Sequence, residues 1–187
     1  MSKVKGSKIT SKLAFVRNEY GEAALTAMVR SMEPTDQESL RMVLDTSWYP
    51  IELYERVIRA ICHTAASGDE TVYTRIGYHS AEEVLNNTYK VFRGKNPVDL
   101  LNKMVPMHSM MNDPGEMEVR SERDGQCTIK VLKPRSMPVI CRVARAFYHR
   151  AVELCGGTAV QVSEVHCSGE GESFCQFDIK WQTRSGA

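Results

Sequence analysis

The chain has 187 residues, 42% of them hydrophobic, which is enough for one domain with its own core. Its 24 basic and 23 acidic residues leave a net charge of +1, which argues against a strongly basic nucleic-acid-binding surface. No window reaches the roughly 20 apolar residues of a membrane span, and no apolar run follows the basic "MSKVKGSK" as in a signal peptide. We therefore expect a cytoplasmic protein.

The first 112 residues predict a block of helices. Apolar residues at helical spacing indicate helices over 9–21, 22–32, 35–44, 47–65, 80–92 and 96–111. Gly21 should end the first of these, and Thr35 with Glu38 forms a capping box for the third. Pro50 suits a first helical turn, whereas Pro106 should kink or stop the last helix.

After residue 112 the pattern changes to strands around one long helix. The alternating residues 115–132 predict a β-hairpin, and a helix should run from Pro138 to Gly156. Two further strands are predicted over 158–167 and 173–181. The sequence thus predicts a single α+β domain: a helical block (1–112), then a ββαββ unit (113–187) with an antiparallel sheet packed on a long helix.

Six cysteines lie at positions 62, 127, 141, 155, 167 and 175. In a reducing cytoplasm they should be free thiols, and clustered thiols suggest a metal. The last hairpin carries the pattern Glu-x2-Cys-x7-Cys, from Glu164 through Cys167 to Cys175. This pattern is open to three interpretations: a metal site, a redox pair, or a hairpin with two small buried residues.

Helix and strand geometry indicates which of these residues can meet. Cys141 and Cys155 are fourteen residues apart on one helix, about 21 Å along its axis, so one ion cannot bind both. A strand returning along that helix would bring Glu164 back to the level of Cys141, and the hairpin would place Cys175 beside Cys167. Three thiolates and a carboxylate suit a closed, structural zinc site. His166 is an alternative to Glu164, since both point to the same strand face.

Residues 138–181 resemble the vinyl-4-reductase domain, a small-molecule-binding module of aromatic-responsive bacterial regulators. Such sensors bind structural zinc through a helix cysteine followed by Glu-x2-Cys-x7-Cys. The resemblance implies the ligand set Cys141, Glu164, Cys167 and Cys175.

Over its full length the chain resembles an uncharacterised paralogous family expanded in myxobacteria. The similar segments are "KLAFVRNEYGE", "SWYPIELYERVIRAI", "ELCGG" and the closing Phe177-x3-Trp181. This likeness implies the ligand-binding fold that vinyl-reductase domains share with haem nitric-oxide sensors and a class of vesicle-tethering subunits.

The leading functional hypothesis is a non-catalytic sensor that binds a hydrophobic small molecule and acts through a protein partner or as a homodimer. The resemblance implies a cavity between the helical block and the sheet. Candidate wall residues are Trp48, Tyr49, Tyr54, Phe92, Met104, Met107, Phe147 and Tyr148.

Three alternatives were weighed. A haem gas sensor would use His108, which lies in an apolar helix, but the Tyr-x-Ser-x-Arg signature that grips the haem propionates in such sensors is absent; haem is therefore not expected. A ligand-free interaction subunit would have no cavity. An enzyme is not expected, because no nucleophile elbow or phosphate loop is present.

Overall fold

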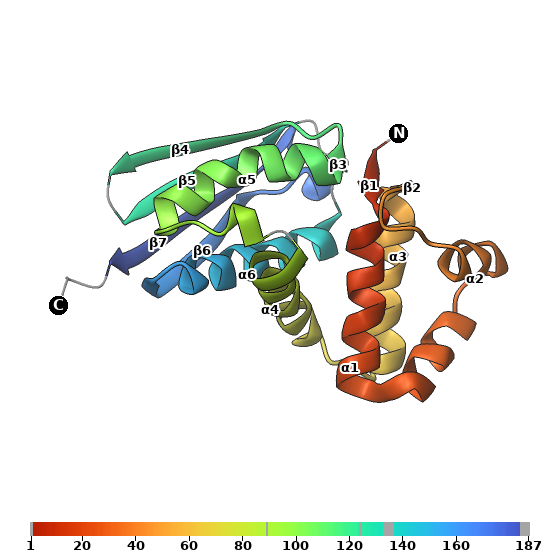
Figure 1. Ribbon diagram of the computed structural model, residues 1–187. Coiled ribbons are helices and arrows are strands. Elements are labelled where there is room, and N and C mark those ends of the chain that lie inside the picture. Colours follow the sequence, from red (N-terminus) through yellow and green to blue (C-terminus); the bar gives the residue numbers. More distant parts are fainter. Residues whose placement is uncertain (1, 89, 124, 133–136, 184–187) are drawn as a thin grey trace.

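The computed structural model describes residues 2–88, 90–123, 125–132 and 137–183. A helical N-terminal part stands beside a four-stranded sheet covered by helices (Figure 1). The helices are α1 (Gly6–Arg30), α2 (Pro34–Arg41), α3 (Ile51–Ala60), α4 (Val72–Glu83), α5 (Pro97–Met111) and α6 (Pro138–Leu154). The strands are β1 (Lys3–Lys5), β2 (Trp48–Pro50), β3 (Asn112–Asp113), β4 (Met117–Arg123), β5 (Gln126–Leu132), β6 (Gly157–His166) and β7 (Phe174–Thr183). The predicted α+β class is confirmed.

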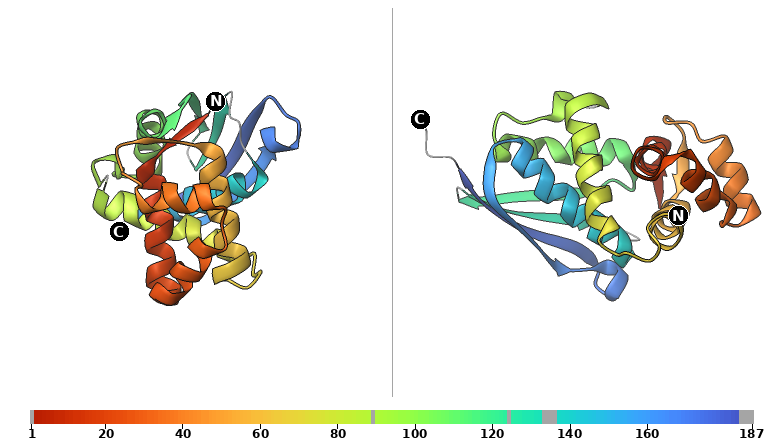
Figure 2. Two further views of the ribbon diagram at one scale, coloured as in Figure 1. Left: turned by 90° about the vertical axis from the view of Figure 1, so that its right-hand side faces the viewer. Right: turned by 90° about the horizontal axis from the view of Figure 1, so that it is seen from below.

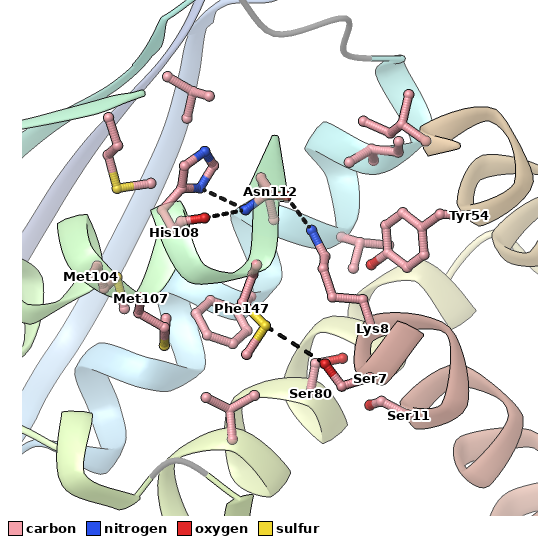
Figure 3. Close-up of a pocket in the computed structure, with 18 of the residues that line it drawn as sticks. Ser7, Lys8, Ser11, Tyr54, Ser80, Met104, Met107, His108, Asn112 and Phe147 are labelled. Atoms are coloured by element: carbon pink, nitrogen blue, oxygen red, sulfur yellow. Dashed lines mark hydrogen bonds between the residues drawn. The ribbon is translucent and has the colours of Figure 1, made fainter. Parts of the chain in front are cut away.

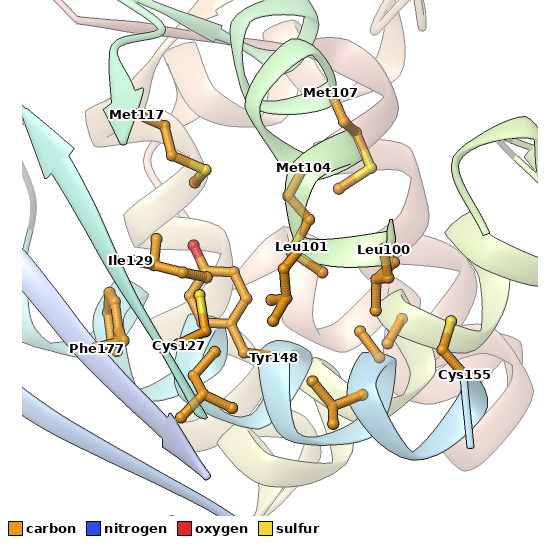
Figure 4. Close-up of a cluster of buried hydrophobic side chains, with 14 of the residues drawn as sticks. Leu100, Leu101, Met104, Met107, Met117, Cys127, Ile129, Tyr148, Cys155 and Phe177 are labelled. Atoms are coloured by element: carbon orange, nitrogen blue, oxygen red, sulfur yellow. The ribbon is translucent and has the colours of Figure 1, made fainter. Parts of the chain in front are cut away.

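The large sheet has the order β4-β5-β7-β6, and every neighbouring pair is antiparallel. Helices α5 and α6 lie on one face of it, and α4 packs on the far side of α6 (Figure 2). The core between helices and sheet is built from apolar side chains of all these elements (Figure 4). Leu101 and Met104 of α5 face Tyr148 of α6, with Ile129 and Phe177 contributed by the strands. Strands β5 and β7 alternate buried with less buried residues over most of their length, and β6 alternates half-buried with exposed residues, as the sequence pattern predicts.

A second, smaller sheet was not predicted. Strand β1 pairs with β2 on one side and with β3 on the other, so the N-terminus ties the start of α3 to the end of α5. These strands have three residues or fewer, too few for an alternating pattern to be read.

Several predicted helix boundaries shift. The chain breaks helical geometry at Gly21 (φ 86°), as predicted, but α2 begins at Pro34 and not after Thr35. Helix α3 begins only after Pro50, which belongs to β2. Helix α4 starts at Val72, eight residues before the predicted helix of that region, and ends at Glu83.

Pro106 was expected to kink or stop α5, yet the helix continues to Met111. Pro106 and Asn102 both lie on the exposed face of the helix. Proline has no backbone N–H to donate to the Asn102 carbonyl, four residues earlier in the helix. Because this carbonyl lies on the exposed face, water can donate to it instead.

Helices α4 and α6 approach one another closely at Gly77. A Cβ at this position would lie 2.5 Å from the Ala146 Cβ and 2.6 Å from the Val143 carbonyl oxygen, so no side chain fits without moving a helix. We expect Gly77→Val to lower the free energy of unfolding by about 1–3 kcal/mol through overpacking. Urea denaturation would measure this, with Thr74→Val on the exposed face of the same helix as control. Equal stability of the two variants would contradict the prediction.

Candidate functional site

A cavity of about 240 Å³ lies between α1, α5, α6 and the sheet (Figure 3). Its apolar wall is formed by Met104, Met107 and Met111 of α5 and by Phe147 and Tyr148 of α6. It exceeds the roughly 150 Å³ of an engineered apolar cavity that binds benzene. Methionine side chains are flexible and can yield to a larger guest. This part of the molecule is therefore suited to bind a small molecule.

The opposite wall is polar and comes from α1. Ser7, Lys8, Ser11 and Lys12 recur at three- and four-residue spacing, so they form one face of the helix, and this face lines the cavity. The cavity thus combines an apolar end with a cationic end.

Both lysine amines lie in the interior. Lys12 is only 3% exposed, and its Nζ donates to the Ser80 Oγ at 2.6 Å. Loss of solvation lowers the pKa of Lys12 to about 7, with a smaller contribution from Lys8. The Lys8 Nζ donates to the Asn112 Oδ1 at 2.8 Å, and burial lowers the pKa of Lys8 to about 8. Both ammonium groups lie beside the Tyr54 ring, 4.9 Å and 5.6 Å from its centroid.

His108 of α5 also lines the cavity and is linked to Lys8 of the opposite wall through Asn112 (Figure 3). The Asn112 Nδ2 donates to the His108 carbonyl oxygen at 2.9 Å and lies 3.2 Å from the His108 Nδ1. Because Lys8 occupies the Asn112 Oδ1, the amide nitrogen must face the ring. Nδ1 therefore accepts, and the ring proton resides on Nε2.

The environment keeps His108 neutral. Burial, and to a lesser degree the nearby Lys8, lowers the pKa of His108 to about 3. A neutral imidazole is the form that can coordinate a metal.

Five of the eight predicted wall residues line the cavity: Tyr54, Met104, Met107, Phe147 and Tyr148. The other three predicted wall residues, Trp48, Tyr49 and Phe92, are not among the described residues that line the cavity. Trp48 is 40% exposed, with the Lys5 Nζ 4.0 Å from its ring centroid. The Tyr49 hydroxyl accepts from the Leu44 backbone N–H at 2.9 Å, and Phe92 packs against the core of the sheet.

The sequence interpretation missed Lys8 and Lys12. Lysines four residues apart on a helix normally mark a solvated face. The signal that could have singled them out is their position among Ile9, Phe15 and Val16, which are all fully or almost fully buried.

The predicted cysteine cluster forms at one end of the helix–sheet interface. The Cys141 Sγ lies 3.5 Å from that of Cys175 and 3.7 Å from that of Cys167, and all three sulfurs are within 4.8 Å of one another. Two thiolates bound to one tetrahedral ion at about 2.3 Å would be about 3.7 Å apart. These three sulfurs could therefore share a cation.

Glu164 lies beside this cluster. Burial first, and then the Glu164 carboxyl, raises the pKa of the Cys167 thiol to about 11. The Glu164 Oε1 is buried without a hydrogen-bond partner among the described residues. His166 instead faces Glu172, with its Nδ1 3.5 Å from a carboxylate oxygen. The full ligand set Cys141, Glu164, Cys167 and Cys175 stays a prediction.

Comparison with known proteins defines the family. Residues 5–150 match the profile of the haem-NO-binding family, and since this is most of the chain, the protein belongs to that family. Comparison with curated proteins returns no match.

Solved structures share the fold over nearly the whole chain. An H-NOX protein from S. oneidensis in the Fe(II)NO state has a TM-score of 0.72 at 14% identity, covering 96% of this chain and 99% of that one. The unliganded Fe(II) H-NOX protein from K. algicida has a TM-score of 0.71 at 12% identity, covering 98% and 99%. At such identities the likeness shows the fold alone.

The family corrects the cofactor prediction. Zinc was expected as the cofactor and haem was not, but the chain belongs to a haem-NO-binding family, so that prediction is wrong. The wider superfamily of haem nitric-oxide sensors is confirmed, whereas the vinyl-4-reductase and myxobacterial likenesses stay predictions. In the described part of the chain, no helix is long and apolar enough to cross a membrane.

Proposed function

We propose that this chain is a haem-based gas sensor in which a ring nitrogen of His108 would hold the haem iron. The observation that carries the proposal is a half-buried, neutral imidazole on the methionine-lined helix of the cavity, in a chain of the haem-NO-binding family. This replaces the hypothesis of a zinc-stabilised sensor for another hydrophobic molecule.

The donor set fits the group. The His108 nitrogen would bind the iron, and Met104, Met107 and Phe147 would contact the porphyrin faces. Haem, when bound, would supply an iron that can take a diatomic gas such as nitric oxide. The flexible methionines allow the cavity to widen around a planar guest.

For this role, the ring proton of His108 must move from Nε2 to Nδ1. To offer the Nε2 lone pair, it must carry its proton on Nδ1, which would then need an acceptor. The Asn112 oxygen can serve after the amide rotates, but Lys8 now holds that oxygen at 2.8 Å. When haem binds, Lys8 would therefore have to release the Asn112 oxygen.

Haemin titration of the purified protein tests the proposed function. We expect a saturable Soret band at one haem per chain, and a shift of that band when nitric oxide is added to the reduced protein. Circular dichroism before the titration establishes that the protein is folded. A folded protein that gives no saturable Soret band would overturn the proposal.

We further propose that the sensor reports through a protein partner or through a homodimer, without catalysis of its own. A ligand-binding domain transmits a signal only through a surface that another molecule reads. The family supports a sensor class, and the partner and the dimer remain proposals.

A further inference from the structure

The amines of Lys8 and Lys12 line the cavity without forming a salt bridge to a described carboxylate. Lys8 and Lys12 project from successive turns of α1 toward the same Tyr54 ring, so their charges are close to one another. In the described part of the chain, no carboxylate oxygen lies within 4.0 Å of either Nζ. Lysines are rarely buried without a partner, because the charged form loses its hydration.

The surrounding acidic groups do not supply that partner. Glu83 also lines the cavity and raises the pKa of Lys12, but it accepts a hydrogen bond from Ser11 and lies 3.7 Å from the His79 Nε2. Asp45 and Asp113 lie at the cavity mouth and are exposed to water. The interior of the cavity therefore has an excess of positive charge.

Each of the two amines also has N–H groups beyond the one that donates to Ser80 or Asn112. Each ammonium has three N–H groups. Lys12 donates to the neutral Ser80 hydroxyl and Lys8 to the neutral Asn112 amide. An incoming anion could bind both amines, and the Ser7 hydroxyl, which now donates only to the Met111 Sδ at 3.7 Å, could turn to it from the same wall.

We propose that Lys8 and Lys12 bind a carboxylate group of the cavity's ligand. The ligand class is an amphipathic carboxylate: its apolar body lies among the methionines and Phe147, and its carboxylate lies at α1. A carboxylate accepts up to four hydrogen bonds and is attracted to both ammonium groups. It would also draw Lys8 away from Asn112, which frees that amide to turn toward His108.

Two sources could provide this carboxylate. Haem carries two propionates, and the Tyr-x-Ser-x-Arg signature that holds them in similar sensors is absent from this sequence. In this case the inference deepens the proposed function. An alkyl carboxylate has the same chemistry without iron, and in this case the lysine site would exist without the haem function.

Paired ligands that differ only in the carboxylate test the proposal. Haemin and haemin dimethyl ester would be titrated by visible absorption, and decanoate and decanol by calorimetry. We expect the acid of at least one pair to bind the unmodified protein at least about tenfold more tightly than its uncharged counterpart, the usual range for a charge-assisted hydrogen bond. In the double variant Lys8→Met/Lys12→Met that preference should disappear, while the ester or alcohol binds at least as tightly as before, because Asn112 is no longer held by Lys8.

Lys180→Met, a change on the exposed face of β7, is the matched control and should keep the preference. Discrimination in the haemin pair identifies the haem propionates as the source. Discrimination only in the decanoate pair, without haemin binding, keeps the lysine site and rejects the haem function. The lysine proposal is overturned if neither acid is preferred, or if the double variant, folded by circular dichroism, retains the full preference.

Discussion

Replacing His108 with glycine should abolish saturable haemin binding to the cavity, and added imidazole should restore it. Among the described residues that line the cavity, His108 is the histidine, and its ring is neutral. Loss of groups that merely support a metal ligand costs roughly 10–100-fold in affinity, so loss of the ligand itself should cost at least about 100-fold. Imidazole can enter the space left by the side chain and supply the missing nitrogen.

The measurement is the Soret band of the titrated variant, with and without imidazole. His63→Gly is the matched control, because His63 is a histidine on the exposed side of a helical segment. It should leave the haemin titration unchanged. If His108→Gly binds haemin with unaltered affinity and an unaltered Soret maximum, a different group holds the iron, and the assignment of His108 is wrong.

Replacing Lys12 with methionine should stabilise the ligand-free protein and flatten its stability profile at alkaline pH. The fold lowers the pKa of Lys12 from 10.5 to about 7, chiefly by burial. Between these values the unfolded chain holds a proton that the folded chain has released, so stability rises as pH increases. At about 1.4 kcal/mol per pKa unit, the ionised amine costs the fold about 3–5 kcal/mol at neutral pH, as an order of magnitude.

The groups that face Lys12 set the size of this effect. Lys8 lowers the pKa of Lys12 further, while Glu83 raises it. Urea denaturation at pH 7 and at pH 10 would measure the effect. The unmodified protein should be more stable at the higher pH than at pH 7. Lys12→Met should reduce that difference and leave the part that Lys8 contributes through its own lowered pKa. Lys180→Met serves again as the control. If Lys12→Met is less stable than the unmodified protein at pH 7, the amine supports the fold, and its burial needs no ligand to explain it.

The sequence itself determined the architecture of the C-terminal half. Alternating residues predicted the strands, and Pro138 predicted the start of α6. The separation of about 21 Å between Cys141 and Cys155 along this helix correctly placed Cys155 outside the thiol cluster of Cys141, Cys167 and Cys175. These inferences succeed because helix rise and strand rise are nearly constant, so spacing along the chain converts directly into position.

The tertiary structure alone decided which side chains face the cavity and in which chemical state. Lys8 and Lys12 occupy one face of α1, and only the placement of α4, α5 and α6 against that face turns it from a solvated face into a cavity wall. The same holds for His108, whose neutrality comes from burial and whose ring proton is assigned by Asn112 and Lys8. Desolvation and hydrogen bonding between distant segments depend on how the elements pack, and no local pattern in the sequence encodes that packing.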